Sequence, residues 1–431
     1  YLFAKKYMKK ISVWFSGSRR NDSAVVPRPN HALSRKKISS SALKVLYRLH
    51  NKGFSAYLVG GGVRDLLLKR ESKDFDVVTD ATPEEIRELF SNSRIIGRRF
   101  KIVHVVFQEE IIEVSTFRAQ EQDHRGRSSR IRYENTFGSL EEDVWRRDFT
   151  VNALYYNISD FSILDYVGGM DDLRDGVIRM LGDPAERFNE DPVRLLRALR
   201  FAAKLNFSME SKMEEEVRRL PDLLYRVPAS RLLHEFEKLF FAGFACKMFS
   251  ALQSYGYLSL LLPEVDVLMK KTQSATTDRL ILLGLENTDS RYKQGKSLNP
   301  AFLFGVLLWP VLMQTLRVQQ ESHTRFFNAL HAAIQQTISQ QQTIIQIPKR
   351  YASMIRSMWV MQFSLEKRRP KRVLPLSRHR YFRAAMDLLE LRAESGEDIS
   401  SLAQWWRQVE KSDVSEVKEM IKQSLKDSSG R

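Results

Sequence analysis

Hydrophobic and polar positions in the first third of the chain change between helical and strand spacing in short segments. Apolar residues in 38–49 recur every three or four positions, which predicts a helix, and 57–59 is a short apolar run that predicts a buried strand. Residues 75–79, 101–107 and 111–117 have the apolar content of further strands, the last two paired around a polar turn. Strands that alternate with helices indicate a small α/β unit with a mixed sheet.

Beyond about residue 170 the strand pattern gives way to long helical periods. Helices are expected over residues 192–205, 231–241, 300–318 and 323–345. Residues up to about 40 are polar, serine-rich and basic without an apolar period, which predicts a poorly ordered arm. The pattern therefore predicts an α+β protein in which an α/β head precedes an all-helical remainder.

Positive charge is in excess and is concentrated in two stretches. The 431 residues include 69 Lys and Arg against 52 Asp and Glu, a net charge of +17. Residues 1–52 contain thirteen basic residues and one acid, and residues 345–385 contain eleven and one. This excess favours a polyanionic partner, with nucleic acid first and an acidic membrane surface second.

Cysteine and long apolar segments are scarce, which excludes several classes of protein. Cys246 is the sole cysteine, so a disulfide within the chain and a cysteine-based zinc site are excluded, and a reducing compartment is favoured. Residues 301–312 are the most apolar stretch, but they fall short of the roughly 20 residues of a spanning helix, and Pro310 interrupts them. We expect a buried helix there and no membrane association.

Two aspartates stand at the start of a predicted strand. Asp74 and Asp76 are two residues apart, so in a strand both carboxylates face one side, with their Cα atoms roughly 6–7 Å apart. Glu113 is a single acid among apolar residues of another strand, where burial without a partner would be costly and a metal would neutralise it. Three such carboxylates suit the Mg²⁺ site of two-metal phosphoryl transfer, although an isolated pair of aspartates is more often plain surface.

Two further segments have residues that suit phosphate and nucleotide binding. Residues 60–62 are glycines between a predicted strand and a helix, where they permit close approach of phosphate oxygens or form only a tight turn. Arg147, Asp148 and Asn152 enter a predicted helix that continues through Tyr156. The arginine would clamp a triphosphate and the Asp or Asn would bind a ribose, unless the segment is a solvated helix start.

A third acidic and basic pair lies further along the chain. Asp191 and Arg194 are three positions apart, which makes them neighbours on one face of a predicted helix. Such a pair can present a donor and an acceptor to a nucleobase, or it can form a helix salt bridge. The sequence alone leaves both alternatives open.

Taken in order, these segments resemble the class II nucleotidyltransferases, the family of bacterial poly(A) polymerases and CCA-adding tRNA nucleotidyltransferases. The similarity covers about residues 40–245 in six blocks: LVGGGVRDLLL, DFDVVTDATPEE, EVSTFR, RRDFTVNALYY, DYVGGMDDLRDGVIRMLGDPAERFNEDPVRLLRALRFAAKL and PASRLLHEFEKLF. Six blocks in the family's order are far more specific than any one of them. The resemblance implies five segments: a basic arm (1–37), a nucleotidyltransferase head (38–170), a helical neck for nucleotide and base recognition (171–245), a helical body (246–346), and a basic RNA-binding region with a tail (347–431).

The resemblance also implies roles for individual residues. It assigns the metal to Asp74 and Asp76, with Glu113 as the third carboxylate, and the sugar side of the nucleotide to Arg147 and Asp148. Nucleotide-binding residues on this basis are Gly60, Gly61, Arg64, Arg147, Asp148, Asn152, Asp191, Arg194 and Arg197. The implied cofactor is Mg²⁺, with Mn²⁺ as an alternative, and the implied substrate is ATP.

Features outside the shared head resemble the poly(A) polymerase branch of the family. The segment IIGRRFKIVHV (95–105) resembles one that marks bacterial poly(A) polymerases, and NPAFLFGVLLWP, IPKR and YFRAAMDLLELRAE resemble their C-terminal half. Expected contacts with RNA phosphates are Arg98, Arg99, Lys349, Arg350, Arg368, Arg369, Lys371 and Arg372. Aromatic residues interleaved with the basic stretch could stack on bases, but a role in the core is favoured for them.

The sequence therefore predicts a polynucleotide adenylyltransferase that adds AMP from ATP to RNA 3′ ends without a template and marks RNA for decay. CCA addition to tRNA is the nearest alternative, because it would use the same metal site. A catalytically idle RNA-binding protein is a further alternative, disfavoured because unpaired carboxylates are costly to keep without a metal. The resemblance implies a cytoplasmic monomer that works with an RNA chaperone and the RNA-decay machinery.

Overall fold

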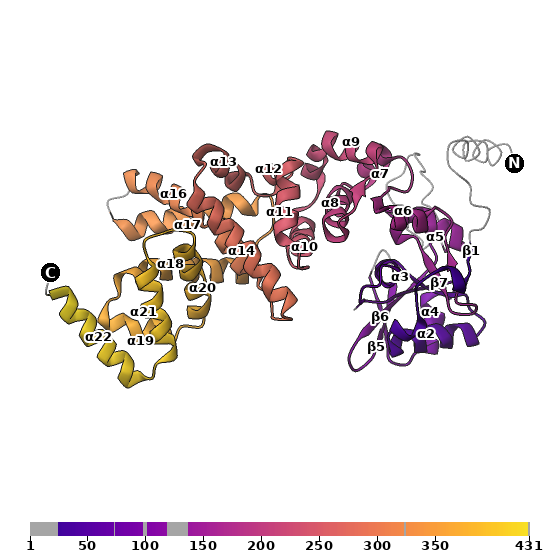
Figure 1. The fold of residues 1–431 in the computed structure, drawn as a ribbon, viewed down its shortest axis with the longest axis horizontal. Helices are drawn as coiled ribbons and strands as arrows, with labels where there is room; N and C mark the ends of the chain where they lie inside the picture. The colour runs from indigo at the N-terminus through magenta and orange to yellow at the C-terminus, as the bar shows by residue number, and fades with distance from the viewer. Residues whose placement is uncertain (1–24, 73, 98–100, 119–136, 323–324, 430–431) are drawn as a thin grey trace. The chain divides into compact units, whose positions relative to one another are not determined.

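The computed structural model describes residues 25–72, 74–97, 101–118, 137–322 and 325–429, and Figure 1 shows its ribbon. The chain forms two compact units. The first extends to Pro184 and includes Ser208–Glu210, and the second contains Ala185–Phe207 and the chain from Ser211 onward. The first unit combines a sheet with helices and the second is helical throughout its described part, so the predicted α+β class is confirmed.

A mixed eight-stranded sheet forms the centre of the first unit. Its strand order is β1-β8-β7-β2-β3-β6-β5-β4. In that order the bounds are Val25–Val26, Ile163–Leu164, Tyr155–Asn157, Ala56–Val59, Asp76–Thr79, Ile111–Thr116, Ile102–Val106 and Ser93–Ile96. The pair β3 and β6 is parallel, while the other neighbouring pairs are antiparallel.

Short helices surround this sheet. Their bounds are Ser40–Asn51 (α2), Gly61–Leu67 (α3), Pro83–Leu89 (α4), Leu140–Arg146 (α5) and Gly169–Asp175 (α6), with 3-10 turns at Arg28–Asn30, Arg35–Lys37 and Thr150–Asn152. Helix α2 packs on β2 and β3, and α4 packs on β4, β5 and β6. Strands β9 (Val177–Ile178) and β10 (Ser208–Met209) form a separate parallel pair.

Two local expectations differ from the observed fold. Val25–Val26 pairs with β8 and the Leu33 side chain is fully buried, so residues 25–37 belong to the head rather than to a poorly ordered arm. Residues 1–24 lie outside the described part of the chain. The predicted helix through Tyr156 is wrong, because Tyr155–Asn157 forms strand β7 and both tyrosines are fully buried. Aromatic residues favour a strand when their side chains can pack within a sheet. Here β2 is the neighbouring strand with which β7 pairs.

The second unit consists of consecutive helices that pack on their neighbours (Figure 1). Their bounds are Pro184–Glu190 (α7), Val193–Leu205 (α8), Ser211–Arg219 (α9), Ala229–Phe240 (α10), Ala245–Ser254 (α11), Leu258–Leu261 (α12), Pro263–Thr272 (α13), Ala275–Lys293 (α14), Pro300–Leu307 (α15), Trp309–Ser322 (α16), Phe326–Gln342 (α17), Lys349–Lys367 (α18), Pro370–Ser377 (α19), Phe382–Glu394 (α20), Ser400–Lys411 (α21) and Val414–Ser429 (α22), with a 3-10 segment at Pro221–Arg226.

The apolar stretch around Pro310 is divided between two helices instead of one, the buried α15 and the buried first turn of α16. Helices α15 and α16 meet at a bend of 51°, with Pro310 in the first turn of α16, where a proline costs no hydrogen bond. Within the described ranges, no individual helix has both the length and the apolar character needed to cross a membrane, and this bent pair passes only by length and composition.

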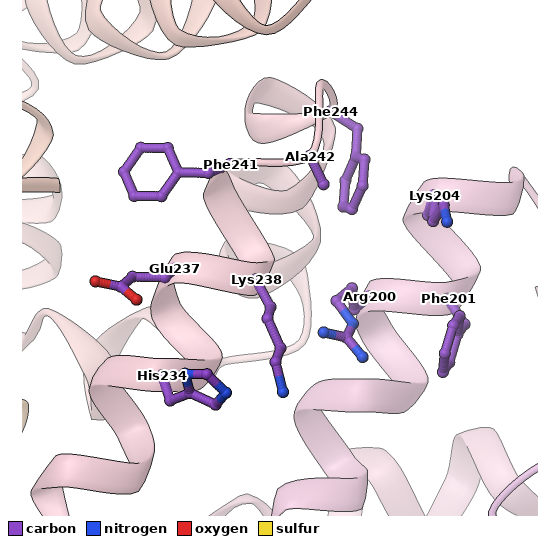
Figure 2. Close-up of a pocket in the computed structure, with 9 residues that line it drawn as sticks. All are labelled: Arg200, Phe201, Lys204, His234, Glu237, Lys238, Phe241, Ala242 and Phe244. Carbon is purple, nitrogen blue, oxygen red and sulfur yellow. The ribbon is translucent and has the colours of Figure 1, made fainter. Parts of the chain in front are cut away.

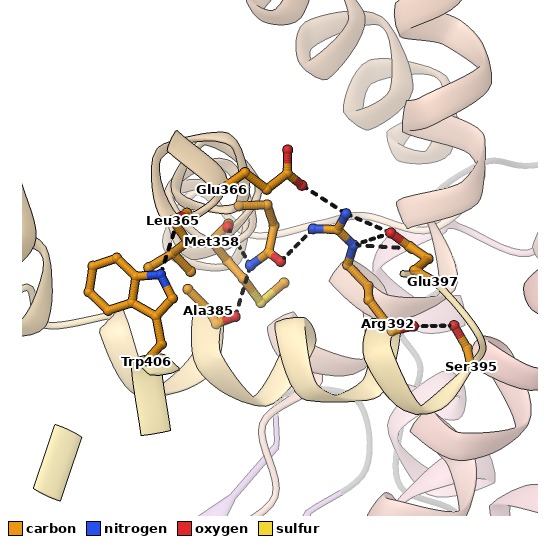
Figure 3. Close-up of polar contacts among 9 residues, drawn as sticks. Met358, Leu365, Glu366, Ala385, Arg392, Ser395, Glu397 and Trp406 are labelled. Carbon is orange, nitrogen blue, oxygen red and sulfur yellow. Dashed lines mark hydrogen bonds and ion pairs between the residues drawn. The ribbon is translucent and has the colours of Figure 1, made fainter. Parts of the chain in front are cut away.

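Buried polar side chains join α18, α20 and α21 (Figure 3). The Gln362 amide donates to the carbonyl oxygen of Ala385 (2.8 Å) and accepts from Arg392 (2.9 Å), and Arg392 also binds Glu366 and Glu397. The indole of Trp406 donates to the carbonyl oxygen of Leu365 (3.0 Å). The central polar groups of this network are hydrogen-bonded, so their burial leaves no uncompensated desolvation cost while the network orients the helices. The network holds α18 in a fixed orientation, and predicted RNA-binding residues lie at both ends of this helix.

Candidate active site

A glycine turn brings α3 close to the start of β3. Gly60 has φ +74° and ψ −137°, a conformation that side chains rarely adopt, and it connects β2 to α3. A Cβ atom on Gly60 would lie 3.7 Å from both the Arg147 Nη1 and the Asp76 Oδ2 atoms. A Cβ atom on Gly62 would lie only 3.0 Å from the carbonyl oxygen of Asp74. The turn, the aspartate pair and Arg147 therefore meet at one edge of the head.

The predicted carboxylates are neighbours in the sheet. Asp76 is the first residue of β3 and stands opposite Glu113 of β6 in the parallel register. Asp74 lies two residues before Asp76, next to the strand. Loss of hydration, followed by repulsion from Glu113 and Asp74, raises the pKa of Asp76 to about 6, against a partial opposing effect of Arg147. The protein thus concentrates negative charge here although the Asp76 side chain keeps access to solvent.

The raised pKa of Asp76 predicts a pH dependence of stability. Its value of about 6 in the folded protein lies above the ordinary value of 3.8, so the native state binds this proton over a range in which the unfolded chain does not. In the presence of a chelator, we expect the free energy of unfolding of the wild type, relative to Asp76→Asn, to be larger at pH 5 than at pH 7. Urea unfolding of both proteins at the two pH values measures this difference. An equal difference at both pH values would contradict the raised pKa of Asp76.

The prediction that Glu113 is a buried charge in need of a metal is wrong, although Glu113 lies in the expected strand. The Glu113 side chain is 52% exposed, so it is not a buried charge without a partner. The Nε2 atom of His104, which faces it across β5 and β6, lies 3.3 Å from its carboxylate. Glu113 alternates with buried Ile112 and Val114 because it points to the opposite, open face of the strand.

The chemistry of these donors fits a divalent cation such as Mg²⁺. Carboxylate oxygens are its preferred ligands, and the mutual repulsion at Asp76 is what a cation would relieve. The side-chain positions are not those of a formed centre, since no three His, Cys, Asp or Glu side chains in the described ranges are grouped to hold a metal. Glu113 would have to turn from His104 to join the aspartates.

Arg147 is held by two residues that the sequence analysis did not single out. Its guanidinium donates to the Tyr155 hydroxyl (2.7 Å) and to the Asp143 carboxylate (3.0 Å), and the Tyr155 hydroxyl donates to the same carboxylate (2.8 Å). Burial lowers the pKa of Arg147, but Tyr155 and Asp143 outweigh it, and the net pKa lies above its usual value. In the sequence, the i, i+4 spacing of Asp143 and Arg147 could have predicted their contact. Arg147 is therefore a fixed positive charge beside Asp76.

A second network links three of the predicted nucleotide-binding residues. The Arg64 side chain is only 2% exposed, and its guanidinium donates to Asp65 (2.7 and 2.8 Å) and to the side-chain Oδ1 atom of Asn152. The Asn152 amide then donates to Asp148 (3.1 Å), which also accepts from the backbone of Phe149. Arg64 is thus placed to position Asn152 and Asp148, a role that its burial favours over direct contact with a triphosphate.

The predicted base-reading residues lie in the second unit, at the start of α8. Asp191 and Arg194 do not form the helix salt bridge that their spacing permits. Asp191 instead accepts from Arg231 (2.7 Å), while Arg194 donates to Glu190 (2.8 Å) and to the backbone of Arg187. Arg231 joins the site only through the packing of α10 near α8, which local spacing does not report. The Arg197 guanidinium lies over the Phe201 ring, 5.4 Å from its centre.

The predicted RNA-binding residues occupy separate places. Arg98 and Arg99 lie outside the described residues. Lys349 and Arg350 are exposed at the beginning of α18, while Arg368, Arg369, Lys371 and Arg372 are exposed around its end. Nineteen helical residues separate the two groups by about 27 Å. Trp359 and Phe363 of the same stretch are buried, which confirms that they belong to the core.

Comparison with known proteins gives consistent matches along the chain. Three family models match: "Poly A polymerase head domain" at residues 56–179, "Probable RNA and SrmB- binding site of polymerase A" at 206–269, and "Polymerase A arginine-rich C-terminus" at 322–431. Poly(A) polymerase I of Salmonella typhi is 44% identical over 408 residues, which cover 92% of this chain and 88% of that protein.

CCA-adding enzymes share less of the sequence. That of Lactobacillus helveticus is 42% identical over 200 residues, which cover 46% of this chain and 49% of that protein. In three dimensions, the Bacillus stearothermophilus CCA-adding enzyme in complex with CTP has a TM-score of 0.59 at 25% identity, covering 85% of this chain and 81% of that one. The fold is therefore shared with the CCA-adding enzyme, whereas sequence similarity along most of the chain is found with Poly(A) polymerase I.

Proposed function

The chain belongs to the poly(A) polymerase I family, and on that premise we propose that it adds AMP from ATP to the 3′ ends of RNA without a template. The reaction is a nucleotidyl transfer that releases pyrophosphate. The observation on which the proposal depends is the extent of the similarity: Poly(A) polymerase I matches over 92% of this chain and a poly(A) polymerase model matches its C-terminal residues 322–431, whereas the CCA-adding relative aligns over 46% of the chain. Membership in an enzyme family also favours catalysis over an idle RNA-binding role.

The head supplies the catalytic group of the proposed reaction. Asp74, Asp76 and Glu113 would hold Mg²⁺, or Mn²⁺ in its place, and the donor chemistry supports this assignment. When bound, the cation would lower the pKa of the RNA 3′-hydroxyl and neutralise charge that develops on the α-phosphate. Positioning and electrostatics account for most of the catalysis in this class of reaction, so no separate general base is required of the chain.

Other residues of the chain bind and orient ATP in this proposal. The Arg147 Nη1 atom lies 3.7 Å from the place that a Cβ atom on Gly60 would take. A side chain at residue 60 would therefore block the approach of a phosphate to this positive charge. Gly60 and Gly61 provide that open backbone, while Asp148 and Asn152 offer acceptor and amide groups for the ribose. In the second unit, Asp191, Arg194 and Arg197 are the residues proposed to select adenine.

The proposal extends to RNA and to the cell. Exposed basic residues at both ends of α18 would bind RNA phosphates by counterion release. Following the family resemblance, we place the enzyme in the cytoplasm as a monomer that cooperates with an RNA chaperone and the RNA-decay machinery. Its tails would mark RNA for degradation.

A primer-extension assay tests the proposed activity. The purified protein with Mg²⁺ is offered an unstructured RNA and, separately, a tRNA that ends before its CCA, each with ATP alone, CTP alone or both. We expect long ladders with ATP on the unstructured RNA and no requirement for CTP. Defined additions to the tRNA that require CTP would instead assign CCA addition, and RNA binding without extension would assign the idle role.

A further inference from the structure

Arg147 belongs to a closed triangle of hydrogen bonds whose members come from two elements of the head. Asp143 lies in α5, Arg147 directly follows that helix, and Tyr155 is the first residue of β7. The Arg147 Nε atom donates to the Tyr155 hydroxyl, its Nη2 atom donates to Asp143, and the hydroxyl donates to the same carboxylate. Each of the three groups therefore binds both of the others. A planar guanidinium that is held at two of its nitrogens has little freedom to turn.

The register of the sheet places this triangle beside the proposed cation site. Tyr155 pairs with Val59 of β2, and Val59 pairs with Asp76 of β3, so these three residues form one row across three strands. At about 4.8 Å per strand, the Cα atoms of Tyr155 and Asp76 are roughly 10 Å apart. Tyr155 and Asp143 are buried, whereas the Arg147 side chain is 23% exposed. The triangle is thus anchored in the core of the head, and Arg147 extends from it to the site.

Arg147 and Asp76 face each other across the glycine turn without joining. The Arg147 Nη1 atom and the Asp76 Oδ2 atom each lie 3.7 Å from the place that a Cβ atom on Gly60 would take. The charge of Arg147 lowers the pKa of Asp76, yet no ion pair links these two side chains in the described part of the chain. An unrestrained arginine would gain energy by pairing with so near a carboxylate. The contacts with Tyr155 and Asp143 keep the guanidinium on its own side.

We propose that Tyr155 and Asp143 are positioning residues that hold Arg147 away from Asp76, which leaves the guanidinium available to a triphosphate and the carboxylate available to a divalent cation. The inference rests on the proposed function, because that function assigns these two ligands. Neither positioning residue would contact ATP. Without them, Arg147 would close on Asp76, and each group would neutralise the other's binding capacity.

Tyr155→Phe tests the proposal, because it removes one side of the triangle and keeps the ring that packs in the core. We expect the Kd for ATP, measured by equilibrium dialysis with Mg²⁺ and without RNA, to rise about fivefold, since one of the two restraints on the guanidinium is lost. The Kd for Mn²⁺ of the protein alone, measured by electron paramagnetic resonance, should rise about threefold, because the released Arg147 competes for Asp76. Asp143→Asn removes the charged restraint and should weaken both ligands at least as much.

The neighbouring tyrosine provides a matched control. Tyr156 is also fully buried in β7, on the opposite side of the sheet, and its hydroxyl has no hydrogen-bond partner within the described ranges. Tyr156→Phe therefore makes the same chemical change without altering the triangle, and both Kd values should stay within about 1.5-fold of the wild type. Equal behaviour of Tyr155→Phe and Tyr156→Phe would overturn the positioning role.

A double-mutant cycle tests whether Tyr155 acts through Arg147. In an Arg147→Ala background, Tyr155→Phe should change neither Kd further, because the group that it positions is gone. A merely structural defect would add its own loss in that background. Lys204→Ala controls for the removal of a positive charge. It lies in a groove between α8 and α10 of the second unit (Figure 2), about 15 Å along α8 from Arg194, and should leave both Kd values unchanged.

The remaining outcomes separate this inference from the proposed function. Additive losses in the double variant, or an unchanged Kd for Mn²⁺ in Tyr155→Phe, would overturn the positioning role. Tyr155→Phe decides the question if urea unfolding shows that Asp143→Asn does not fold. A wild type that binds ATP and Mn²⁺ but extends no primer would refute the proposed function, while the same Kd values would still judge the triangle. A wild type that binds no Mn²⁺ would overturn both.

Discussion

Asp76→Asn should lower the kcat of adenylate transfer by roughly 10³-fold or more while leaving the Kd for RNA within about twofold of the wild type. Asparagine keeps the shape of the side chain but removes the charge that stands between Glu113 and Arg147. Because the proposed cation requires ionised oxygen ligands, loss of one central carboxylate should disable the site without altering the helical unit. Steady-state primer extension and fluorescence anisotropy with the same RNA measure the two quantities.

Matched variants define what the Asp76 result would mean. Asp74→Asn should produce a comparable loss, because its carboxylate is proposed to bind the same cation. Glu109→Gln, an exposed acid in the turn between β5 and β6, should keep wild-type activity and so controls for the change of net charge. Activity retained in Asp76→Asn would remove this residue from the metal site. Simultaneous loss of RNA binding would show that the substitution acts on folding rather than on catalysis.

Arg64→Ala should lower the free energy of unfolding by about 3 kcal/mol. The side chain is buried, and its removal leaves Asp65 and Asn152, also buried, without the donors that now satisfy them. A buried charge that loses its partner costs far more than a surface pair, and this loss is a large part of the 5–15 kcal/mol that typically stabilises a folded domain. Urea unfolding, followed by a signal from the first unit, measures the change.

Two comparisons distinguish positioning by Arg64 from direct contact with ATP. Arg87→Ala removes an exposed arginine from α4 and should change stability by less than about 0.5 kcal/mol. Arg64→Lys retains the charge but not the fork that reaches Asp65 and Asn152 together, so an intermediate loss is expected. An Arg64→Ala protein with unchanged stability and a raised KM for ATP would show instead that the guanidinium contacts the nucleotide.

Local sequence pattern was sufficient for much of the head. The apolar pattern predicted strand β3, which begins at Asp76, and the break in apolar spacing predicted the Gly60 turn between a strand and a helix. It was insufficient at Tyr155. The local sequence there predicts a helix, but pairing with β2 makes the segment a strand. It also placed Glu113 in the right strand but on the wrong side, because an acid between two buried residues alternates outward rather than inward.

The sequence by itself determined the family, the order of strands and helices, and the candidate residues, because short-range spacing and motif order are written along the chain. Only the tertiary structure decided which of those residues meet. The parallel pairing of β3 with β6 sets Asp76 beside Glu113, and the folding of α3 against the segment after α5 joins Arg64 to Asn152. Likewise, Asp191 is bound by Arg231, forty residues away, rather than by its helical neighbour. The physical reason is that a buried or charged group is satisfied by whatever partner the packing brings near, and periodicity reports which side of an element is buried but not what lies against it.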